Sequence, residues 1–164
     1  MTKYLALDQA LQTTGFAAFD EKELIEVGSF SISANKNIEE RLGIFEERLD
    51  QLYKVYNFDH LFFEDIQKQQ NIETFKRLSY VQATILLWCW RNNIPYTILS
   101  PSHWRLIIKE RYKINFGRSR KEQKQTAQNF ISTKYSLNSS EDECDAVCIG
   151  LAGIHELNAT CSAF

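Results

Sequence analysis

The sequence contains little that would keep a chain extended, flexible or embedded in a membrane. It has only 2 prolines and 6 glycines among 164 residues, which excludes a fibrous protein and leaves little room for flexible linkers. The longest apolar run, from Ala83 to Trp90, ends at Arg91 and is much shorter than the roughly 20 residues that span a bilayer. The amino terminus leads directly into a strand-like pattern and does not resemble a signal peptide. We therefore expect a protein without membrane contact that stays in the cytoplasm.

Cysteine is also scarce, and its spacing excludes the common zinc motifs. The four cysteines are Cys89, Cys144, Cys148 and Cys161, and in a cytoplasmic chain they are expected to remain thiols. Cys144 and Cys148 lie four residues apart and His155 follows, but no second pair of ligands with the usual spacing accompanies them. A structural zinc site is therefore an alternative that the spacing does not favour.

The charges are unevenly distributed along a chain of otherwise ordinary globular composition. Hydrophobic residues make up 44% and charged residues 24% of the chain, and its length suits a single domain over residues 1–164. From Arg105 to Lys124, the basic arm, eight basic residues stand against two acidic ones, whereas the whole chain has a net charge of −2. A basic arm on a mildly acidic protein is typical of nucleic-acid enzymes, although a solvated basic helix has the same composition.

The hydrophobic pattern predicts an α/β fold. Strands are predicted at 4–7, 15–19, 24–33, 61–63 and 96–99, and helices at 38–56, 73–92, from 101, after 119, and at 144–157. Short turns make the first three strands an antiparallel meander. The later strand–helix–strand crossovers then predict a mixed five-stranded sheet with helices on both faces. A capping box over residues 140–143 is expected to open the last helix.

Four acidic residues stand where this fold would bring them together. Asp8 ends the first strand, Glu64 ends the fourth, and Asp142 and Asp145 lie in the first turn of the last helix. Taken singly, each has an ordinary explanation as a turn former or a partner of the helix dipole. If the first and fourth strands are parallel neighbours, about 4.8 Å apart, the carboxylates converge and require cations. Oxygen ligands suit Mg²⁺ or Mn²⁺, and two such ions about 3.5–4 Å apart form the clamp used in phosphodiester hydrolysis.

Four stretches also keep the order and spacing of a known family. They are Tyr4-Leu5-Ala6-Leu7-Asp8, Thr14-Gly15-Phe16, Phe62-Phe63-Glu64-Asp65 and Asp142-Glu143-Cys144-Asp145-Ala146-Val147. This pattern resembles the RuvC family of Holliday-junction resolvases, within the ribonuclease H-like nuclease superfamily. The Asp-x-x-Asp-Ala stretch on a helix is its most specific element. The compact chain is more similar to phage-encoded versions than to the bacterial ones.

The resemblance implies a function and a set of site residues. It implies an endonuclease that binds two Mg²⁺ or Mn²⁺ ions and, as a homodimer, cuts symmetric strands of a four-way junction, leaving 5′-phosphate and 3′-hydroxyl ends. The four carboxylates would be its metal ligands and catalytic residues. RuvC has lysines close to the active site; Lys121 stands in the place of one of them, and Arg105 in what looks like the place of the other.

Additional DNA-binding residues are expected from the basic arm and from the polar loop that follows the fourth strand. They are Arg105, Lys109, Arg118, Arg120 and Lys124 in the arm, and Gln67, Lys68 and Asn71 in the loop. The sequence departs from the RuvC pattern at two places. The first motif reads Asp8-Gln9-Ala10 where RuvC has Asp-Pro-Gly. Gln67 stands near the place of an aromatic residue that stacks on a junction base, a difference that bears on cleavage-sequence preference and on selectivity for four-way junctions.

The helix predicted at 73–92 carries more large apolar residues than one sheet face can cover. Tyr80, Ile85, Leu87, Trp88 and Trp90 cannot all face the same core at 100° per residue. Exposing them would create a larger apolar patch than monomers usually show. We therefore predict a two-fold interface in which this helix packs on its copy; the alternative is a core helix beneath the carboxyl-terminal helices.

Other functions share parts of this pattern. One is a different ribonuclease H-like nuclease that acts on flaps or RNA–DNA hybrids, and another is a non-catalytic module that binds branched DNA. A sugar kinase or actin-like ATPase also has an acidic residue after its first strand and a later Thr-Gly, but that fold needs two such domains, and 164 residues supply one.

Overall fold

The computed structural model describes residues 1–67 and 70–161. The elements in these ranges follow the predicted order. The strands are β1 (Lys3–Asp8), β2 (Thr13–Asp20), β3 (Glu23–Ser31), β4 (His60–Glu64) and β5 (Tyr96–Leu99). The helices are α1 (Ile38–Tyr56), α2 (Ile72–Asn92), α3 (Pro101–Tyr112), α4 (Arg120–Tyr135) and α5 (Glu141–Cys161). The last helix is longer at both ends than the sequence pattern predicted.

The strands form one mixed sheet in the order β3-β2-β1-β4-β5. β1, β2 and β3 pair antiparallel, which confirms the predicted meander. β4 lies parallel to β1, and β5 lies parallel to β4. The carboxyl ends of β1 and β4 therefore meet at the same edge of the sheet, next to each other.

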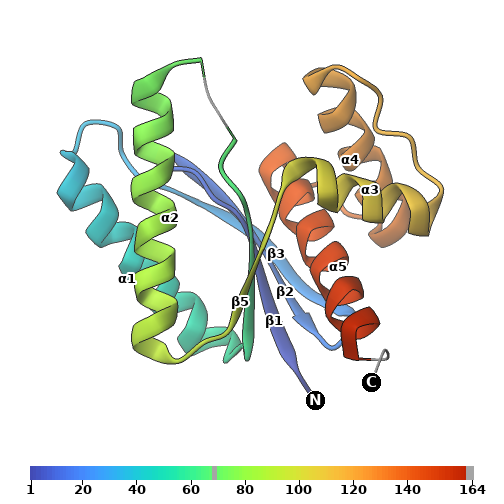
Figure 1. Cartoon of the computed structure of the whole chain (residues 1–164), viewed down its shortest axis with the longest axis horizontal. Coiled ribbons are helices and arrows are strands. Elements are labelled where there is room, and N and C mark those ends of the chain that lie inside the picture. The colour runs from blue at the N-terminus through green and yellow to red at the C-terminus, as the bar shows by residue number, and fades with distance from the viewer. Residues whose placement is uncertain (68–69, 162–164) are drawn as a thin grey trace.

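Helices cover both faces of this sheet, as predicted (Figure 1). Helices α1 and α2 lie on one face; α5 packs on the other, with α3 and α4 beside it. Because side chains alternate along a strand, β1 contributes to two separate cores. Leu5 and Leu7 pack with α1 and α2, whereas Tyr4 and Ala6 pack with α5.

Helix α5 lies unusually close to the sheet, and this closeness sets the position of its first turn. A Cβ atom at Gly150 would lie 2.2 Å from the ring of Phe19, so only glycine fits there. The predicted capping box fixes the start of the helix. The Glu143 N–H donates to Ser140 Oγ at 3.3 Å, and the Ser140 N–H donates to Glu143 Oε2 at 2.9 Å.

Among residues 1–67 and 70–161, no helix combines the length and the apolar character needed to cross a bilayer. Cys89, Cys144 and Cys148 are buried and form no disulfide, as predicted. His155 Nδ1 lies 3.1 Å from Arg111 Nη1. In the part of the chain that the structure describes, no three potential ligands form a group that could hold a metal ion.

Candidate active site

Two acidic residues end the two central parallel strands. Asp8 is the last residue of β1, and Glu64 is the last residue of β4. The last backbone pair between these strands joins Leu7 to Phe63, so Asp8 and Glu64 are the next residues along. Both strands are buried runs that become half-buried at their acidic ends. The two carboxylates therefore reach the surface side by side.

The first turn of α5 brings two more carboxylates to this edge. Asp142 and Asp145, three residues apart, share a helix face, and the side chain of Asp145 is only 5% exposed. The turn lies directly over Gly15, the partner of Asp8 in the β1–β2 pairing. A Cβ atom at Gly15 would lie 2.1 Å from the carbonyl oxygen of Asp142. The Thr-Gly element of the sequence thus leaves space for the start of α5.

A Gly15→Ala substitution should push the start of α5 away from the sheet. We expect the free energy of unfolding to fall by about 1–3 kcal/mol, as for other overpacked sites, and Asp142 to move away from the other carboxylates. Gly43 offers a matched control, because a Cβ atom there meets nothing within 4 Å. Gly43→Ala, inside α1, should stabilise the protein by about 0.5–1 kcal/mol. Urea unfolding of both variants measures the difference, and a Gly15→Ala protein as stable as wild type would contradict this packing.

Lys124 lies at the centre of the carboxylate cluster. Its Nζ is 2.6 Å from Asp145 Oδ2, 3.6 Å from Asp142 Oδ1 and 3.7 Å from Asp8 Oδ2. The side chain of Lys124 is 15% exposed. It extends from α4, where Ser119 caps the helix and Ala127 and Ile131 are buried. One ammonium group therefore offsets part of the charge of three carboxylates.

The structure places Lys124, and not Lys121, at the carboxylate cluster. The prediction put Lys121 at the active site and Lys124 among the DNA-binding residues. In the structure, Lys121 lies in the first turn of α4 and is exposed. The physical reason is helical periodicity, because Lys124 shares a helix face with the buried Ala127 and Ile131.

Burial and mutual repulsion disturb the ionisation of this cluster. The pKa of Asp8 is raised from 3.8 to about 8, first by burial and then by Asp145, while Lys124 opposes the shift. Burial also raises the pKa values of Glu64 and Asp145. For Lys124, burial alone would lower the pKa, but the nearby carboxylates outweigh it and raise the value. A further positive charge at this place would therefore stabilise the ionised form of the carboxylates.

Trp104 holds Glu64 in place, a contact that the sequence analysis missed. Its Nε1 donates a hydrogen bond to Glu64 Oε2 at 2.7 Å, which lowers the pKa of Glu64 against the effect of burial. Trp104 is fully buried in α3, and the guanidinium of Arg105 lies 4.4 Å from its ring centre. A buried indole N–H needs an acceptor, but its partner becomes visible only when α3 is placed against β4.

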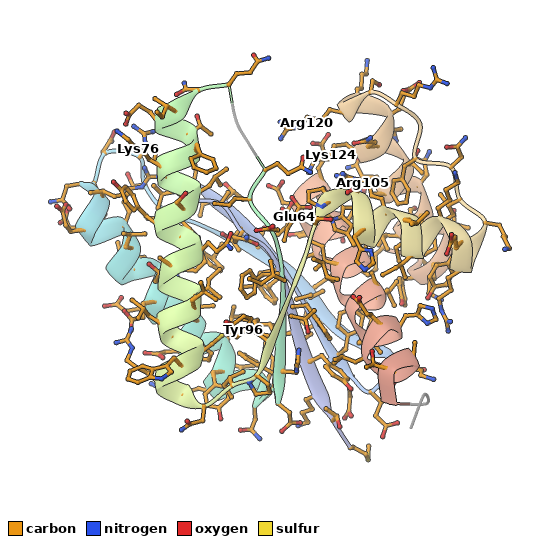
Figure 2. All side chains as sticks on the ribbon, viewed as in Figure 1. Glu64, Lys76, Tyr96, Arg105, Arg120 and Lys124 are labelled. Atoms are coloured by element: carbon orange, nitrogen blue, oxygen red, sulfur yellow. The ribbon has the colours of Figure 1, made fainter. Side chains whose placement is uncertain are left out.

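A cavity of about 480 Å³ opens over the carboxylates, and residues of the basic arm line it. Figure 2 shows Glu64, Arg105, Arg120 and Lys124 gathered at this place, between the two groups of helices, with Tyr96 at the opposite end of the sheet. Arg118 also lines the cavity. Lys109 lies outside it and lines a neighbouring cavity of about 420 Å³, which shares Arg105. The structure thus brings Arg105, Arg118 and Arg120 to the cavity over the carboxylates. It places Lys109 farther along α3.

The residues predicted from the polar loop have different surroundings. Gln67 lines both of these cavities, and Lys68 lies outside the described residues. Asn71 is the N-cap of α2, and its side chain accepts hydrogen bonds from the backbone N–H groups of Glu73 and Thr74. The side-chain oxygen of Asn71 thus starts the helix as its N-cap, and its contact with DNA stays a prediction.

The donor set suits a divalent cation, although it is not arranged as a closed metal site. Among residues 1–67 and 70–161, no three acidic, histidine or cysteine side chains form such a site. The ammonium of Lys124 lies between Asp8, Asp142 and Asp145. That ammonium is a stand-in cation, and it marks the point where positive charge is needed. Carboxylate oxygens alone favour Mg²⁺ or Mn²⁺, so the residues present fit the predicted ions.

The sheet order, the parallel crossovers and the acidic edge define a ribonuclease H-like α/β fold. The same fold occurs in RuvC from Thermus thermophilus, in a structure with a Holliday junction substrate. This chain matches it with a TM-score of 0.75 and 12% sequence identity over 98% of both chains. The predicted fold class is therefore confirmed.

Two curated proteins are similar to this chain in sequence, and both are RuvC crossover junction endodeoxyribonucleases. The protein from Clostridioides difficile (strain 630) is 24% identical over 156 residues, covering 92% of this chain and 89% of that protein. The one from Fusobacterium nucleatum is 24% identical over 165 residues, covering 98% and 84%. No family model matches the chain.

Proposed function

We propose that this protein is a metal-dependent endonuclease that resolves four-way DNA junctions. The observation that carries the proposal is the convergence of four carboxylates, from β1, β4 and α5, at the base of a cavity lined by arginines. The similarity to two RuvC endonucleases over nearly the whole chain supports both the reaction and the DNA substrate. We extend the proposal to a phage-encoded enzyme that acts in the cytoplasm of its host.

The carboxylates would hold two Mg²⁺ or Mn²⁺ ions. Asp8, Glu64, Asp142 and Asp145 are the ligands in this proposal, and Trp104 orients Glu64 through its hydrogen bond. Bound ions would supply a polarised water for attack on phosphorus and would stabilise the leaving 3′-oxygen, which leaves a 5′-phosphate. Lys124 is close enough to three ligands to share their charge and to contact a phosphate oxygen that enters the cavity.

The basic arm would bind the DNA backbone around this site. Arg105, Arg118 and Arg120 line the acidic cavity and would contact phosphates next to the cleaved one. Lys109, in the neighbouring cavity, would contact the strand farther along. Because these contacts release counterions, affinity for DNA should fall steeply with salt.

We also propose a homodimer that forms through α2. The helix buries one side, which includes Ile85 and Trp88, against the rest of the protein. The opposite side remains apolar at the surface: Tyr80 is 46%, Leu87 57% and Trp90 76% exposed. The alternative of a fully buried core helix does not fit these exposures. An exposed apolar stripe on one helix is suited to packing on a second copy, and two active sites are needed for symmetric cutting.

A Leu87→Glu variant should be monomeric and should make uncoordinated nicks in place of paired cuts. The new charge would be buried in the interface between the two helices. Val55→Glu is the matched control, since Val55 is 70% exposed on α1 and its variant should remain dimeric. Analytical ultracentrifugation at micromolar concentration measures the assembly state. A wild-type protein that sediments as a monomer even on junction DNA would exclude this interface.

A single set of cleavage assays tests the proposed function. Four-way junctions, three-way junctions, flaps, linear duplexes and RNA–DNA hybrids are incubated with the protein in Mg²⁺, Mn²⁺ or EDTA. Paired cuts in the four-way junction with either ion, and none in EDTA, are expected. Preferential cutting of flaps or hybrids would support the other ribonuclease H-like nucleases, and binding of branched DNA without cleavage would support the non-catalytic module.

A further inference from the structure

The backbone pairing between β1 and β4 stops just before the two acidic residues. Its last pair is Leu7 and Phe63, and beyond that pair the side-chain amide of Gln9 bonds to the main-chain groups of Glu64. The Glu64 N–H donates to Gln9 Oε1 at 3.2 Å, and Gln9 Nε2 donates to the carbonyl oxygen of Glu64. One amide thus provides an acceptor and a donor, as a peptide group of β1 would.

The backbone around Gln9 is itself held firmly. Gln9 is only 7% exposed. The next residue, Ala10, is bonded through both of its main-chain groups to Thr14. Its N–H donates to Thr14 Oγ1 at 3.1 Å, and its carbonyl oxygen accepts from Thr14 Oγ1 at 2.8 Å. The buried guanidinium of Arg41 donates to the carbonyl oxygen of Leu11 at 2.9 Å. The amide of Gln9 therefore projects from a fixed turn and joins that turn to the end of β4.

We infer that Gln9 is a positioning residue that fixes the separation of Asp8 and Glu64, so that the two carboxylates form a preset pair for a divalent ion. The two carboxylates repel each other at the ends of neighbouring strands. The amide of Gln9, the residue that follows Asp8, holds the end of β4 against this repulsion. Proline, which the RuvC pattern has at this place, offers no side-chain amide. The inference rests on the proposed function for the role of the ion.

The test needs a measure of ion binding that does not depend on cleavage. Tb³⁺ prefers oxygen ligands, as Ca²⁺ and Mg²⁺ do, and its luminescence can be excited through a nearby indole. Trp104 lies in the site, with Nε1 2.7 Å from Glu64 Oε2. Indole-excited Tb³⁺ luminescence therefore reports ions that bind close to a tryptophan, as these carboxylates lie close to Trp104.

Gln9→Met removes the amide while keeping the length of the side chain. Its affinity for Tb³⁺ should fall by about 10–100-fold, the usual loss when a group that orients a metal ligand is removed. The Mg²⁺ concentration for half-maximal cleavage should rise by a similar factor, with cleavage partly recovered at high Mg²⁺. Gln12→Met is the matched control, since Gln12 is exposed in the same loop and this variant should bind Tb³⁺ as wild type does. Gln9→Asn, which keeps a shorter amide, provides a second variant with a smaller expected loss.

The outcomes separate this inference from the proposed function. If Gln9→Met binds Tb³⁺ as tightly as Gln12→Met and differs only in unfolding temperature, Gln9 is merely structural and the inference is overturned. If no variant binds Tb³⁺ in the site, the inference is overturned as well. If wild type cleaves none of the DNA substrates, the proposed function fails, while the Tb³⁺ titrations still decide whether Gln9 positions the carboxylates.

Discussion

An Asp8→Asn variant should bind four-way junctions as wild type does but cleave them at least ~1,000-fold more slowly. The substitution keeps the shape of the side chain and removes one negative charge from the cluster around Lys124. Charge stabilisation by a bound metal is worth several kcal/mol in the transition state, and about 4 kcal/mol corresponds to a factor of ~1,000 in rate. The arginines that line the cavity are unchanged, so affinity for DNA should persist.

Asp59→Asn is the matched control for this experiment. Asp59 precedes β4 at the opposite edge of the sheet and is exposed, with its Oδ2 accepting from the backbone N–H of Lys3. The same charge change there should leave cleavage unaffected. Single-turnover cleavage and gel-shift binding, measured on both variants, give the comparison. Cleavage by Asp8→Asn at a rate near that of wild type would remove Asp8 from the catalytic site.

The same variant should change how stability depends on pH in EDTA. Asp8 has an ordinary pKa of 3.8 in the unfolded chain and about 8 in the folded protein, mainly because it is buried. Between these values the folded state holds a proton that the unfolded state has lost, so the contribution of Asp8 to stability falls as pH rises from about 4 to about 8.

Asp8→Asn should therefore gain stability relative to wild type over this pH range, and the gain should level off above pH 8. Each pKa unit corresponds to about 1.4 kcal/mol, so urea unfolding at pH 5 and pH 8 is sensitive enough to detect the trend. A difference between the two proteins that is constant with pH would contradict the burial of an acid at this position.

The convergence of the four carboxylates could be predicted from the sequence because each stands beside a strong local pattern. Asp8 and Glu64 follow short buried apolar runs, and Asp142 lies within a helix-capping motif. Residues whose roles depend on contacts between elements were harder to predict. Trp104 and Gln9 have partners in β4 that become visible only when α3 and β1 are placed beside that strand.

Local signals in the sequence account for the positions of Asn71 and Lys124 in the structure. Asn71 directly precedes a helix, and asparagine is among the preferred N-cap residues. Lys124 lies three and seven residues before the apolar Ala127 and Ile131, a spacing that predicts the same helix face. Lys121 was selected by its correspondence with a family position, without regard to this periodicity, and the structure shows it exposed.

Exchange of each lysine for methionine should separate their roles. Lys124→Met should reduce cleavage by about 100–1,000-fold, comparable to the loss of a preorganised charge in an active site. It should also lower the free energy of unfolding in EDTA by up to about 3 kcal/mol, because Asp145 and its neighbours lose the cation that lies 2.6–3.7 Å away. Added Mg²⁺ should restore much of this stability, since an ion that binds only the folded state shifts the unfolding equilibrium.

Lys121→Met should behave differently in every measurement. An exposed lysine in the first turn of α4 contributes at most a long-range attraction to DNA, so cleavage at saturating enzyme and stability in EDTA should match wild type. A modest loss of affinity for all DNA shapes, with a smaller salt dependence, is the expected change. The reverse pattern, with Lys121→Met inactive and Lys124→Met active, would require α4 to rotate about its axis when DNA binds. It would return the active-site role to the residue that the family resemblance first indicated.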